Sequence, residues 1–477
     1  MNFRNVRPLS PLPLKFLLCV CLAFAGLCAE AAKSKPNILI IVADQWRFDA
    51  FGYAGNKDVK TPHLDLLARE SVNFQNAIVS VPVCCPTRAT LLTGQRALTH
   101  GVFLNDAPLS PDAKGLGKVL KNEGYDTAYV GKWHLNGDGR SSFIPRERRQ
   151  GFDYWKVLEC THDYNNSLYF GDTPEKLKWE GYDAIAQTRD AQSFLRGRAE
   201  NKKPFLFVLA WGPPHDPYFS APEKYRALYD AKTLRLRGNV PPELAEETRR
   251  KLAGYYAHCS ALDDCVGDLL QTLRDTGLEK ETIVIFTSDH GDMLGSHGLA
   301  KKQKPWDEAI RVPMLFRWPD TLKARTLDAV FNSEDFMPTV LGLARVNLPK
   351  TIEGADYSKH MRGGKNPFES AALISCVAPF GEWERSNGGK EFRGIRTERY
   401  TYVRDLDGPW LFFDNQTDPL QLANLVGKAS NQKLEAKLNG ILKHKLRQTR
   451  DEFLPGDFYV KKWGYQTDAR GTIPYTD

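Results

Sequence analysis

Short, continuously apolar segments recur along the chain, and a polar turn follows each of them. They are Asn37–Ala43, Asp126–Val130, Pro204–Ala210 and Thr282–Thr287. Segments of this length and β-branched content are typical of strands that are buried on both faces of a parallel sheet. Between them, Thr61–Glu70 has helical spacing, with Thr61 as the N-cap and Pro62 at the first helical position. The pattern predicts an α/β fold with a large, mixed but mostly parallel sheet sandwiched by helices.

The polar turns place Asp, His or Lys directly after each predicted strand. They are Asp44-Gln45, Gly131-Lys132-Trp133-His134, Trp211-Gly-Pro-Pro-His215 and Ser288-Asp289-His290-Gly291-Asp292. In open α/β sheets, ligands bind beyond the carboxyl ends of the strands. Each turn by itself could be purely structural. Together, the turns predict a single site at one edge of the sheet.

The pattern changes after about residue 365. Ala371–Cys376, Gly394–Val403 and Trp410–Asp414 alternate between apolar and polar residues in the manner of antiparallel strands, and Gln432–Arg447 has helical spacing. We therefore expect a catalytic domain over residues 32–365 and a smaller C-terminal α+β subdomain with an antiparallel sheet over residues 366–477.

The N-terminus has the features of a secretory signal peptide. Arg4, Arg7 and Lys15 precede an apolar run over residues 16–29, and Ala-Glu-Ala follows at residues 29–31. We expect cleavage after Ala31 and export, either to the periplasm or out of the cell. The run is shorter than the roughly 20 apolar residues that span a bilayer, so stable membrane insertion is not expected.

Composition and charge exclude several classes of protein. The chain has 477 residues, 42% of them hydrophobic and 26% charged, as in soluble globular proteins. The formal net charge of +7 contains no dense Lys/Arg block, so nucleic acid is not an expected partner. A mild basic excess suits an anionic ligand, and it equally suits an ordinary solvated surface. Outside the predicted signal peptide the cysteines have no CxxC spacing, which argues against a zinc ribbon.

The adjacent pair Cys84-Cys85 begins the most informative motif, Cys84-Cys85-Pro86-Thr87-Arg88-Ala89-Thr90-Leu91-Leu92-Thr93-Gly94. This segment resembles the signature of the sulfatase family, Cys-x-Pro-Ser/Thr-Arg followed by x-x-x-Leu-Thr-Gly. The resemblance covers about residues 36–427 and implies an alkaline-phosphatase-like fold. The structural alternative is a pair of buried thiols before a helix.

The resemblance implies a sulfuric ester hydrolase. In the family, a dedicated maturation enzyme oxidises the first cysteine of the motif, here Cys84, to Cα-formylglycine (3-oxoalanine). The hydrated aldehyde offers two hydroxyl groups: one attacks sulfur and displaces the alcohol, and the other loses its proton to expel sulfate. A hard cation acidifies the attacking hydroxyl.

The resemblance further implies a calcium site. Its expected ligands are Asp44, Gln45, Asp289, His290 and an oxygen of the modified Cys84. The family usually has two Asp residues at the first strand end, and this chain has Asp-Gln, which keeps an oxygen donor and lowers the negative charge. His290 is a less usual calcium ligand than an oxygen donor.

Further roles carry over from the family to basic residues of this chain. Lys132 and Lys302 are expected to bind the sulfate oxygens, and Arg88 to hold the formylglycine and the sulfate. His215 is expected to protonate the departing oxygen, and His134 to assist the release of sulfate. Lys301 and Lys304 are close competitors of Lys302.

The expected substrate is a sulfated poly- or oligosaccharide, because export suits an extracellular carbohydrate. His162 and Arg393 are candidate substrate-binding residues because of their residue types and their positions in the sequence. The same argument adds Arg140, Arg146, Asp163, Tyr164 and Arg396. Each of these residues could equally belong to an ordinary surface loop. Two other readings are a phosphatase or phosphonate monoester hydrolase of the same superfamily, and a non-catalytic protein that captures sulfated glycans.

Overall fold

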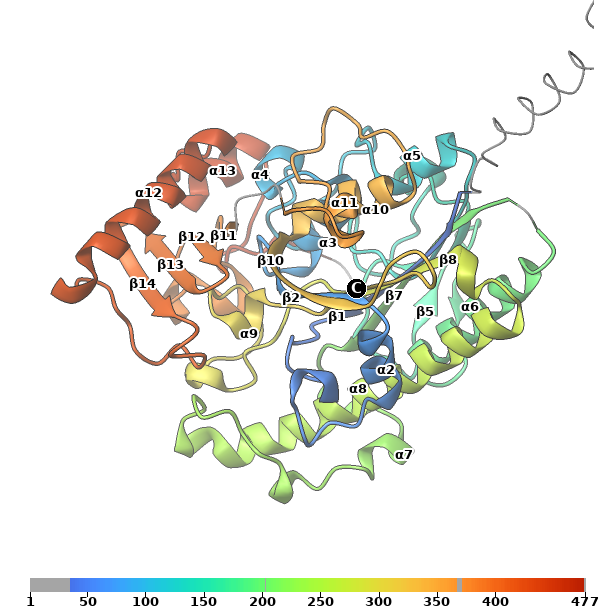
Figure 1. Cartoon of the computed structure of the whole chain (residues 1–477), viewed down its shortest axis with the longest axis horizontal. Helices are drawn as coiled ribbons and strands as arrows, with labels where there is room; N and C mark the ends of the chain where they lie inside the picture. The colour runs from blue at the N-terminus through green and yellow to red at the C-terminus, as the bar shows by residue number, and fades with distance from the viewer. Residues whose placement is uncertain (1–34, 202, 367–370, 476–477) are drawn as a thin grey trace, which may run out of the picture. The chain divides into compact units, whose positions relative to one another are not determined.

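The computed structural model describes residues 35–201, 203–366 and 371–475. Its central element is an eight-stranded sheet with the strand order β10-β2-β9-β8-β1-β7-β3-β4. Figure 1 shows this sheet with its strands β1, β2, β7, β8 and β10 labelled. The strands are β1 (Asn37–Asp44), β2 (Val72–Ile78), β3 (Asp126–Lys132), β4 (Tyr154–Leu158), β7 (Phe205–Pro214), β8 (Thr282–Ser288), β9 (Met314–Arg317) and β10 (Arg325–Asn332). Only β9 runs antiparallel to its neighbours β8 and β2. The predicted mixed, mostly parallel sheet is confirmed. The predicted signal peptide, residues 1–31, lies outside the described residues.

Strand β1 shows why the sheet is covered on both faces. Ile38, Ile40 and Val42 belong to one buried cluster, and the intervening Leu39 and Ile41 belong to another. Successive side chains of a strand point to opposite faces, so a continuously apolar strand needs a layer on each side. The structure therefore follows from the apolar pattern of the strand.

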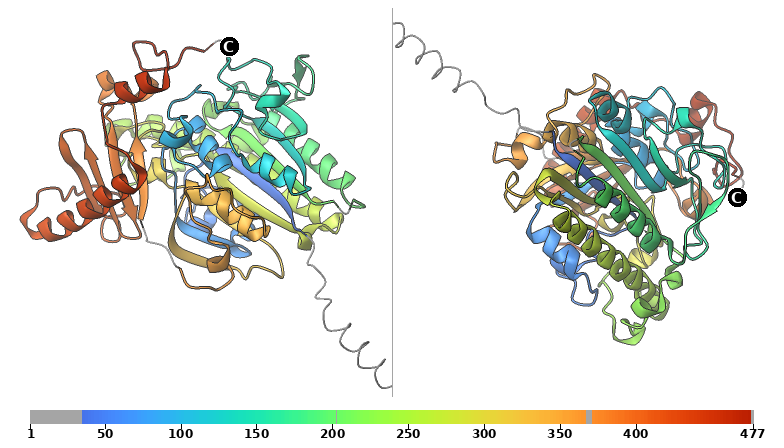
Figure 2. Two further views of the ribbon diagram at one scale, coloured as in Figure 1. Left: turned by 90° about the horizontal axis from the view of Figure 1, so that it is seen from above. Right: turned by 90° about the vertical axis from the view of Figure 1, so that its right-hand side faces the viewer.

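Helices supply both layers (Figures 1 and 2). The first group is α3 (Cys84–Thr93), α5 (Leu116–Asn122) and α10 (Phe336–Leu343), and the second is α2 (Pro62–Arg69), α6 (Asp183–Gly197) and α8 (Ala245–Asp275). The remaining short elements are α4 (Ala97–His100), α7 (Glu223–Arg226), α9 (Asp307–Ile310), α11 (Ser358–Met361), β5 (Leu168–Tyr169) and β6 (Leu177–Lys178). Among the described helices, none is both long and apolar enough to span a membrane.

A four-stranded antiparallel sheet follows, in the order β11-β12-β13-β14. Its strands are β11 (Ala371–Cys376), β12 (Phe392–Thr397), β13 (Tyr400–Asp405) and β14 (Gly408–Asp414). Helix α12 (Gln432–Thr449) packs on it through Leu438 and Leu442, and α13 (Gly456–Trp463) comes after α12.

The prediction of one strand over Gly394–Val403 is wrong, because β12 and β13 form a hairpin there. The hydroxyl of Thr397 accepts hydrogen bonds from the backbone N–H groups of Arg399, at 3.3 Å, and Tyr400, at 2.8 Å. This side-chain bond turns the backbone. The turn contains no Gly, Pro or Asn, which are the usual signals of a turn.

Candidate active site

The polar turns that follow β1, β3, β7 and β8 meet at one edge of the large sheet, as the sequence predicts. They bring together the side chains of Asp44, Lys132, His215 and Asp289, all of which are buried. Helix α3 begins at the same place and presents Cys84 from its first residue. The parallel registers of β1 with β7 and with β8 explain the convergence, because parallel strands end at the same edge.

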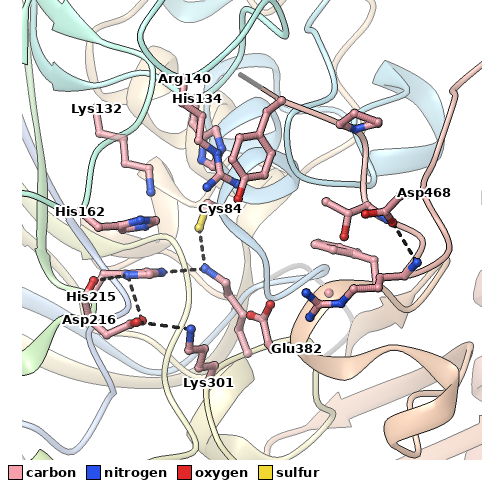
Figure 3. A pocket seen from close by; sticks show the side chains of 17 residues that line it. Cys84, Lys132, His134, Arg140, His162, His215, Asp216, Lys301, Glu382 and Asp468 are labelled. Carbon is pink, nitrogen blue, oxygen red and sulfur yellow. Dashed lines mark hydrogen bonds and ion pairs between the residues drawn. The ribbon is translucent and has the colours of Figure 1, made fainter. Parts of the chain in front are cut away.

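We define the floor as Cys84, Lys132, His215 and Lys302 together with the buried Asp44, Arg88 and Asp289 beside them. The first four line a cavity of about 490 Å³ (Figure 3), and the other three do not line it. This volume lies within the range of roughly 300–1,000 Å³ that is typical of small-ligand sites. Its lining residues come from distant parts of the chain: Cys84, Lys132, His134, Arg140, His162, His215, Asp216, Lys301, Lys302, Phe380, Gly381, Glu382, Asp468, Arg470, Thr472, Pro474 and Tyr475. Cationic and imidazole groups outnumber carboxylates among them, so the cavity suits an anion.

Cys84 lies between two basic side chains. Its Sγ atom is 2.9 Å from Lys302 Nζ and 3.2 Å from His290 Nε2. Burial and the charge of Asp44 oppose ionisation of the thiol, but Lys132, Lys302 and His290 outweigh them and hold the pKa of Cys84 well below its usual value. The N-terminus of α3 also favours negative charge at this position. The environment therefore stabilises an anionic or strongly polarised group on the Cβ of residue 84.

Two buried carboxylates are oriented by cations. Arg88 donates hydrogen bonds to Asp289 Oδ2 at 3.1 Å and to Asp44 Oδ2 at 3.2 Å. Lys132 Nζ lies 2.6 Å from the same Asp44 oxygen. Burial would raise the pKa of Asp44, but the charges of Lys132 and Arg88 hold it well below its usual value. The Oδ2 atoms of Asp44 and Asp289 are thus held by cations. Their Oδ1 atoms lie 3.6 and 3.7 Å, respectively, from His290 Nε2.

Gln45 adopts a left-handed backbone conformation, with φ 71°, that turns its amide into the site. Its Nε2 donates a hydrogen bond to Asp292 Oδ2 at 2.7 Å, and Tyr218 donates its hydroxyl to the same oxygen at 2.6 Å. A carboxylate at position 45 could not donate to Asp292 and would repel it. The Asp292 carboxylate therefore gives a physical reason for Gln rather than Asp at position 45.

The donor set fits a hard divalent cation. Ligand atoms of Asp44, Cys84, Asp289 and His290 all lie within 4.8 Å of one another. Gln45 Oε1 is buried and has no hydrogen-bond partner within the described ranges, which leaves a carbonyl oxygen free to bind a cation. The backbone carbonyl of Gly291 lies 2.9 Å from His290 Nδ1, so Nδ1 donates its proton there and the Nε2 lone pair faces the site.

His215 forms a hydrogen bond with Lys302. Lys302 Nζ lies 3.0 Å from His215 Nε2, while Nδ1 donates to the carbonyl of Asp216 at 2.9 Å. Burial and the charge of Lys302 hold the pKa of His215 well below its usual value. The neutral ring stacks on His162 with centroids 4.7 Å apart. The exposed His162 therefore lies at the cavity mouth, in contact with His215 on the floor.

His134 is supported by a carboxylate that the sequence analysis did not single out. Asp106 Oδ1 lies 3.1 Å from His134 Nε2, and Arg140 binds Asp106 through two hydrogen bonds of 3.0 and 2.9 Å. Burial opposes protonation of His134, but Cys85, Cys160 and the Asp106 bond hold its pKa well above the usual value. Asp106 follows no predicted strand, so no pattern in the sequence could identify it. Asp292, in contrast, lies in the same turn as Asp289 and could have been weighed.

Of the predicted substrate-binding residues, His162 and Arg140 line the cavity. Arg146 and Asp163 do not line it: Arg146 pairs with Asp153, and Asp163 is exposed. Tyr164 is fully buried and donates its hydroxyl to backbone carbonyls that include that of His215. Its contribution is to the shape of the loop rather than to the surface of the cavity.

The structure does not bring Arg393 and Arg396 into the cavity. Arg393 is completely buried, and its guanidinium binds Asp451 and the carbonyl of Cys376. Arg396 forms two hydrogen bonds, of 2.9 and 3.0 Å, with the Asp307 carboxylate. This pair fastens the antiparallel sheet to α9. The proposal that Arg393 reads the substrate is therefore corrected: its side chain has no access to the cavity.

Comparison with known proteins gives two family matches and several relatives. A family model described as Sulfatase matches residues 36–346, and one described as N-sulphoglucosamine sulphohydrolase, C-terminal, matches residues 295–451. The chain is 45% identical over 451 residues to an ulvan-active sulfatase of Formosa agariphila, covering 93% of this chain and 87% of the relative. It is 30% identical to an endo-4-O-sulfatase of Bacteroides thetaiotaomicron, covering 83% and 89% of the two chains.

Solved structures agree with these matches. The crystal structure of yidJ of Bacteroides fragilis has a TM-score of 0.81 at 31% identity, covering 91% of this chain and 100% of that chain. A phosphonate monoester hydrolase of Agrobacterium radiobacter has a TM-score of 0.72 at 24% identity, covering 88% of this chain and 96% of that chain. At that identity the second likeness shows only the shared fold.

Proposed function

The chain belongs to the sulfatase family, and from this premise we propose that it removes sulfate from a sulfated carbohydrate by means of Cα-formylglycine at position 84 and a bound calcium ion. The predicted family and enzyme class, a sulfuric ester hydrolase, are confirmed. The substrate, the modification and the metal are the proposed parts.

The surroundings of Cys84 carry the proposal. Its Sγ marks the place of the oxygen that formylglycine would bear on Cβ. The atom lies 2.9 Å from Lys302 Nζ and 3.8 Å from Asp44 Oδ1, which puts it between a sulfate-binding cation and the donors of a divalent metal. A structural thiol would need neither neighbour.

The modified residue 84 and the metal would each supply one kind of chemistry. Formylglycine at position 84 would supply the nucleophilic oxygen, and calcium held by Asp44, Gln45, Asp289 and His290 would make that oxygen more acidic. Arg88 orients both metal-binding carboxylates through their Oδ2 atoms. The protein thereby keeps the donors in place without depending on the metal.

The remaining residues act on the sulfate ester. Lys132 and Lys302 neutralise the charge on the sulfate oxygens as the S–O bond breaks. The negative charge of the bound ester counteracts Lys302, which is one cause of the low pKa of His215. His215 can then hold a proton at Nε2 and donate it to the departing oxygen.

His134 is the candidate for moving a proton in the second half of the reaction. It lines the same cavity as Cys84. Its Nδ1 is buried and has no hydrogen-bond partner within the part of the chain that the structure describes. Asp106 fixes the opposite side of the ring, so Nδ1 is the atom at which a proton can be held or passed on.

A sulfated polysaccharide or a fragment of one is the proposed substrate. The relative from Formosa agariphila is named an ulvan-active sulfatase, and that from Bacteroides thetaiotaomicron an endo-4-O-sulfatase. The cationic lining of the cavity supports an anionic substrate. We also propose that the enzyme is exported after loss of residues 1–31, to the periplasm or out of the cell, and that it needs a formylglycine-generating maturation enzyme.

The test uses protein that is produced together with a maturation enzyme. Two quantities are measured: the mass of the peptide that contains Cys84, and the release of sulfate from ulvan oligosaccharides and other sulfated sugars. We expect the mass of the aldehyde form together with sulfate release that a chelator abolishes and calcium restores. Phosphate and phosphonate monoesters serve as the comparison substrates. An unmodified thiol in fully active protein, or faster turnover of phosphonates than of any sulfate ester, would contradict the proposal.

A further inference from the structure

A segment far from every motif forms one side of the catalytic cavity. It comprises residues 468–475, and the residues that line the cavity together with Cys84 are Asp468, Arg470, Thr472, Pro474 and Tyr475. Figure 3 shows Asp468 on the opposite side of the cavity from His162 and His215. Any substrate that reaches Cys84 through this cavity therefore passes along the segment.

The segment is held in a defined conformation. The carboxylate of Asp468 accepts hydrogen bonds from the backbone N–H groups of Arg470, at 2.9 Å, and Thr472, at 2.8 Å. The N–H of Gly381 donates to the carbonyl of Arg470 at 3.0 Å, which ties the segment to another loop of the cavity lining. Ile473 packs against two buried apolar clusters. The segment is thus a preformed wall whose own contacts orient it.

The same wall touches the supports of the catalytic floor. The guanidinium of Arg140 lies 3.4 Å from the ring centroid of Tyr475, a favourable cation–π arrangement. Arg140 binds Asp106, which in turn binds His134. Tyr475 therefore holds the outer end of a chain of contacts that reaches a catalytic histidine.

Arg470 differs from the other cations at the cavity mouth. Arg140 is committed to Asp106 by two short hydrogen bonds, and Lys301 lies 3.3 Å from Asp216. Arg470 has one longer ion pair, from Nε to Glu384 at 3.5 Å, and its side chain is 60% exposed. A guanidinium offers parallel N–H donors that match a carboxylate or a sulfate group. Arg470 is thus available to a ligand.

We propose that segment 468–475 is the specificity wall of the cavity, and that Arg470 binds a second anionic group of the substrate. This inference rests on the proposed function. The sulfate to be cleaved has its own cations, Lys132 and Lys302, on the floor beside Cys84. Arg470 lines the mouth instead and meets a group further along the carbohydrate. The shared chemistry is an oxyanion, which is either the carboxylate of a uronic acid or a second sulfate.

The experiment compares Arg470→Ala with Arg250→Ala in the full, matured enzyme. Arg250 is an equally exposed arginine, 60% by side chain, with a 3.9 Å ion pair on helix α8, and it does not line the cavity. The probes are 4-nitrophenyl sulfate, a sulfated disaccharide containing a uronic acid, its carboxyl-reduced counterpart and a disulfated neutral disaccharide. Steady-state kinetics give kcat and KM for each probe.

Two of the probes carry a second anionic group, the uronic-acid disaccharide and the disulfated disaccharide. We expect Arg470→Ala to lower kcat/KM about tenfold or more for one of these two, mainly by raising KM, because a charge-assisted hydrogen bond is lost. The carboxyl-reduced sugar and the aryl sulfate should keep their wild-type rates, as should every probe with Arg250→Ala. A loss on the uronic-acid probe identifies a carboxylate, and a loss on the disulfated probe identifies a second sulfate. Equal losses on all probes, or no loss on any, would overturn the inference.

Failure of the proposed function has a different signature. In that case the wild-type enzyme would hydrolyse the aryl sulfate but release no sulfate from any sugar probe, which overturns the carbohydrate substrate and the inference with it. Two variants of Tyr475 guard against a purely structural effect. Tyr475→Phe keeps the ring over Arg140 and should retain the wild-type kcat and KM for every probe. Tyr475→Ala should alter KM for the sugars and leave the melting temperature nearly unchanged.

Discussion

The floor of the cavity and its outer wall are built in opposite ways. On the floor, Arg88 is buried and forms ion pairs with two buried carboxylates, Asp44 and Asp289. On the wall, Arg470 and Tyr475 are exposed by 60% and 42%, and they belong to a segment remote in sequence from the floor. Ion pairs hold the charged groups of the floor in place, whereas the guanidinium of Arg470 on the wall is available to a ligand.

The difference has an energetic consequence. Removing one member of a buried ion pair strands its partner and costs about 3–5 kcal/mol. An exposed ion pair contributes about 0–1 kcal/mol. Removing a charged partner from the floor should therefore affect both reaction and stability, whereas the wall can change with little effect on the fold. Substitutions on the floor and on the wall should therefore separate effects on the reaction from effects on substrate specificity.

The largest expected effect is that of Cys84→Ala. Turnover of every sulfate ester should fall by about a thousandfold or more, because the nucleophilic position is lost. The melting temperature should change little, since the substitution removes one small side chain. Sulfate release and thermal unfolding measure the two quantities, with Cys265→Ala, a buried cysteine of α8 away from the cavity, as the control. Substantial residual turnover would mean that residue 84 does not carry the reaction.

The adjacent residues Lys302 and Lys301 compare floor and mouth directly. Lys302 is 4% exposed and touches Cys84, and the Lys301 side chain is 36% exposed and pairs with Asp216. Lys302→Ala should lower kcat by about a hundredfold to a thousandfold, and Lys301→Ala should mainly raise KM by about threefold. Steady-state kinetics on one sulfated sugar separate the two. Equal effects would show that the floor and the mouth are not distinct.

The Asp307–Arg396 pair tests whether burial alone gives catalytic importance. Burial opposes ionisation of Asp307, but Arg396 and Arg311 lower its pKa to about 2, below that of an ordinary aspartate. A lowered carboxyl pKa stabilises the fold above pH 4, and this contribution of about 2 kcal/mol is lost as pH falls from 4 to 2.

Arg396→Met should therefore lower stability at pH 6 and flatten its dependence on pH between 4 and 2. Urea unfolding at several pH values measures both changes, and kcat at pH 7 should stay near that of the wild type. A large fall in kcat in folded protein would show that this buried pair also serves the active site.

The smallest expected effect is that of His162→Ala. The residue is exposed and stacks on His215, so its removal should raise KM for sulfated sugars about threefold, as expected of a partly solvated contact, and leave kcat nearly unchanged. Asp163→Ala, an exposed neighbour outside the cavity lining, is the matched control. A large fall in kcat would place residue 162 on the floor rather than at the mouth.

Much of the floor could be predicted because its residues follow local patterns. Asp44, Lys132 and Asp289 come at or just after apolar strands, and parallel strands bring such positions to one edge. The Cys84–Gly94 motif occupies a single buried helix and its cap, so its spacing is contained in one short segment. Both signals depend only on neighbours in the sequence.

The residues that the sequence analysis assigned wrongly or missed depend instead on contacts that are distant in the sequence. Arg393 and Arg470 are both arginines of the C-terminal part, yet one is completely buried against Asp451 and the other lines the cavity. Residue type and position in the sequence cannot separate them. Asp106 likewise gains its role only through contacts with His134 and Arg140. Such roles depend on partners that lie far away in the chain.

The sequence by itself determined the α/β fold and the family, and it predicts a nucleophilic position at Cys84, because the period of apolar residues and the spacing of a motif are local properties of a chain. The tertiary structure decided which of two adjacent lysines reaches Cys84, why Gln suits position 45, and which distant segment forms the wall. Those outcomes depend on packing and charge pairing between residues that only folding brings together.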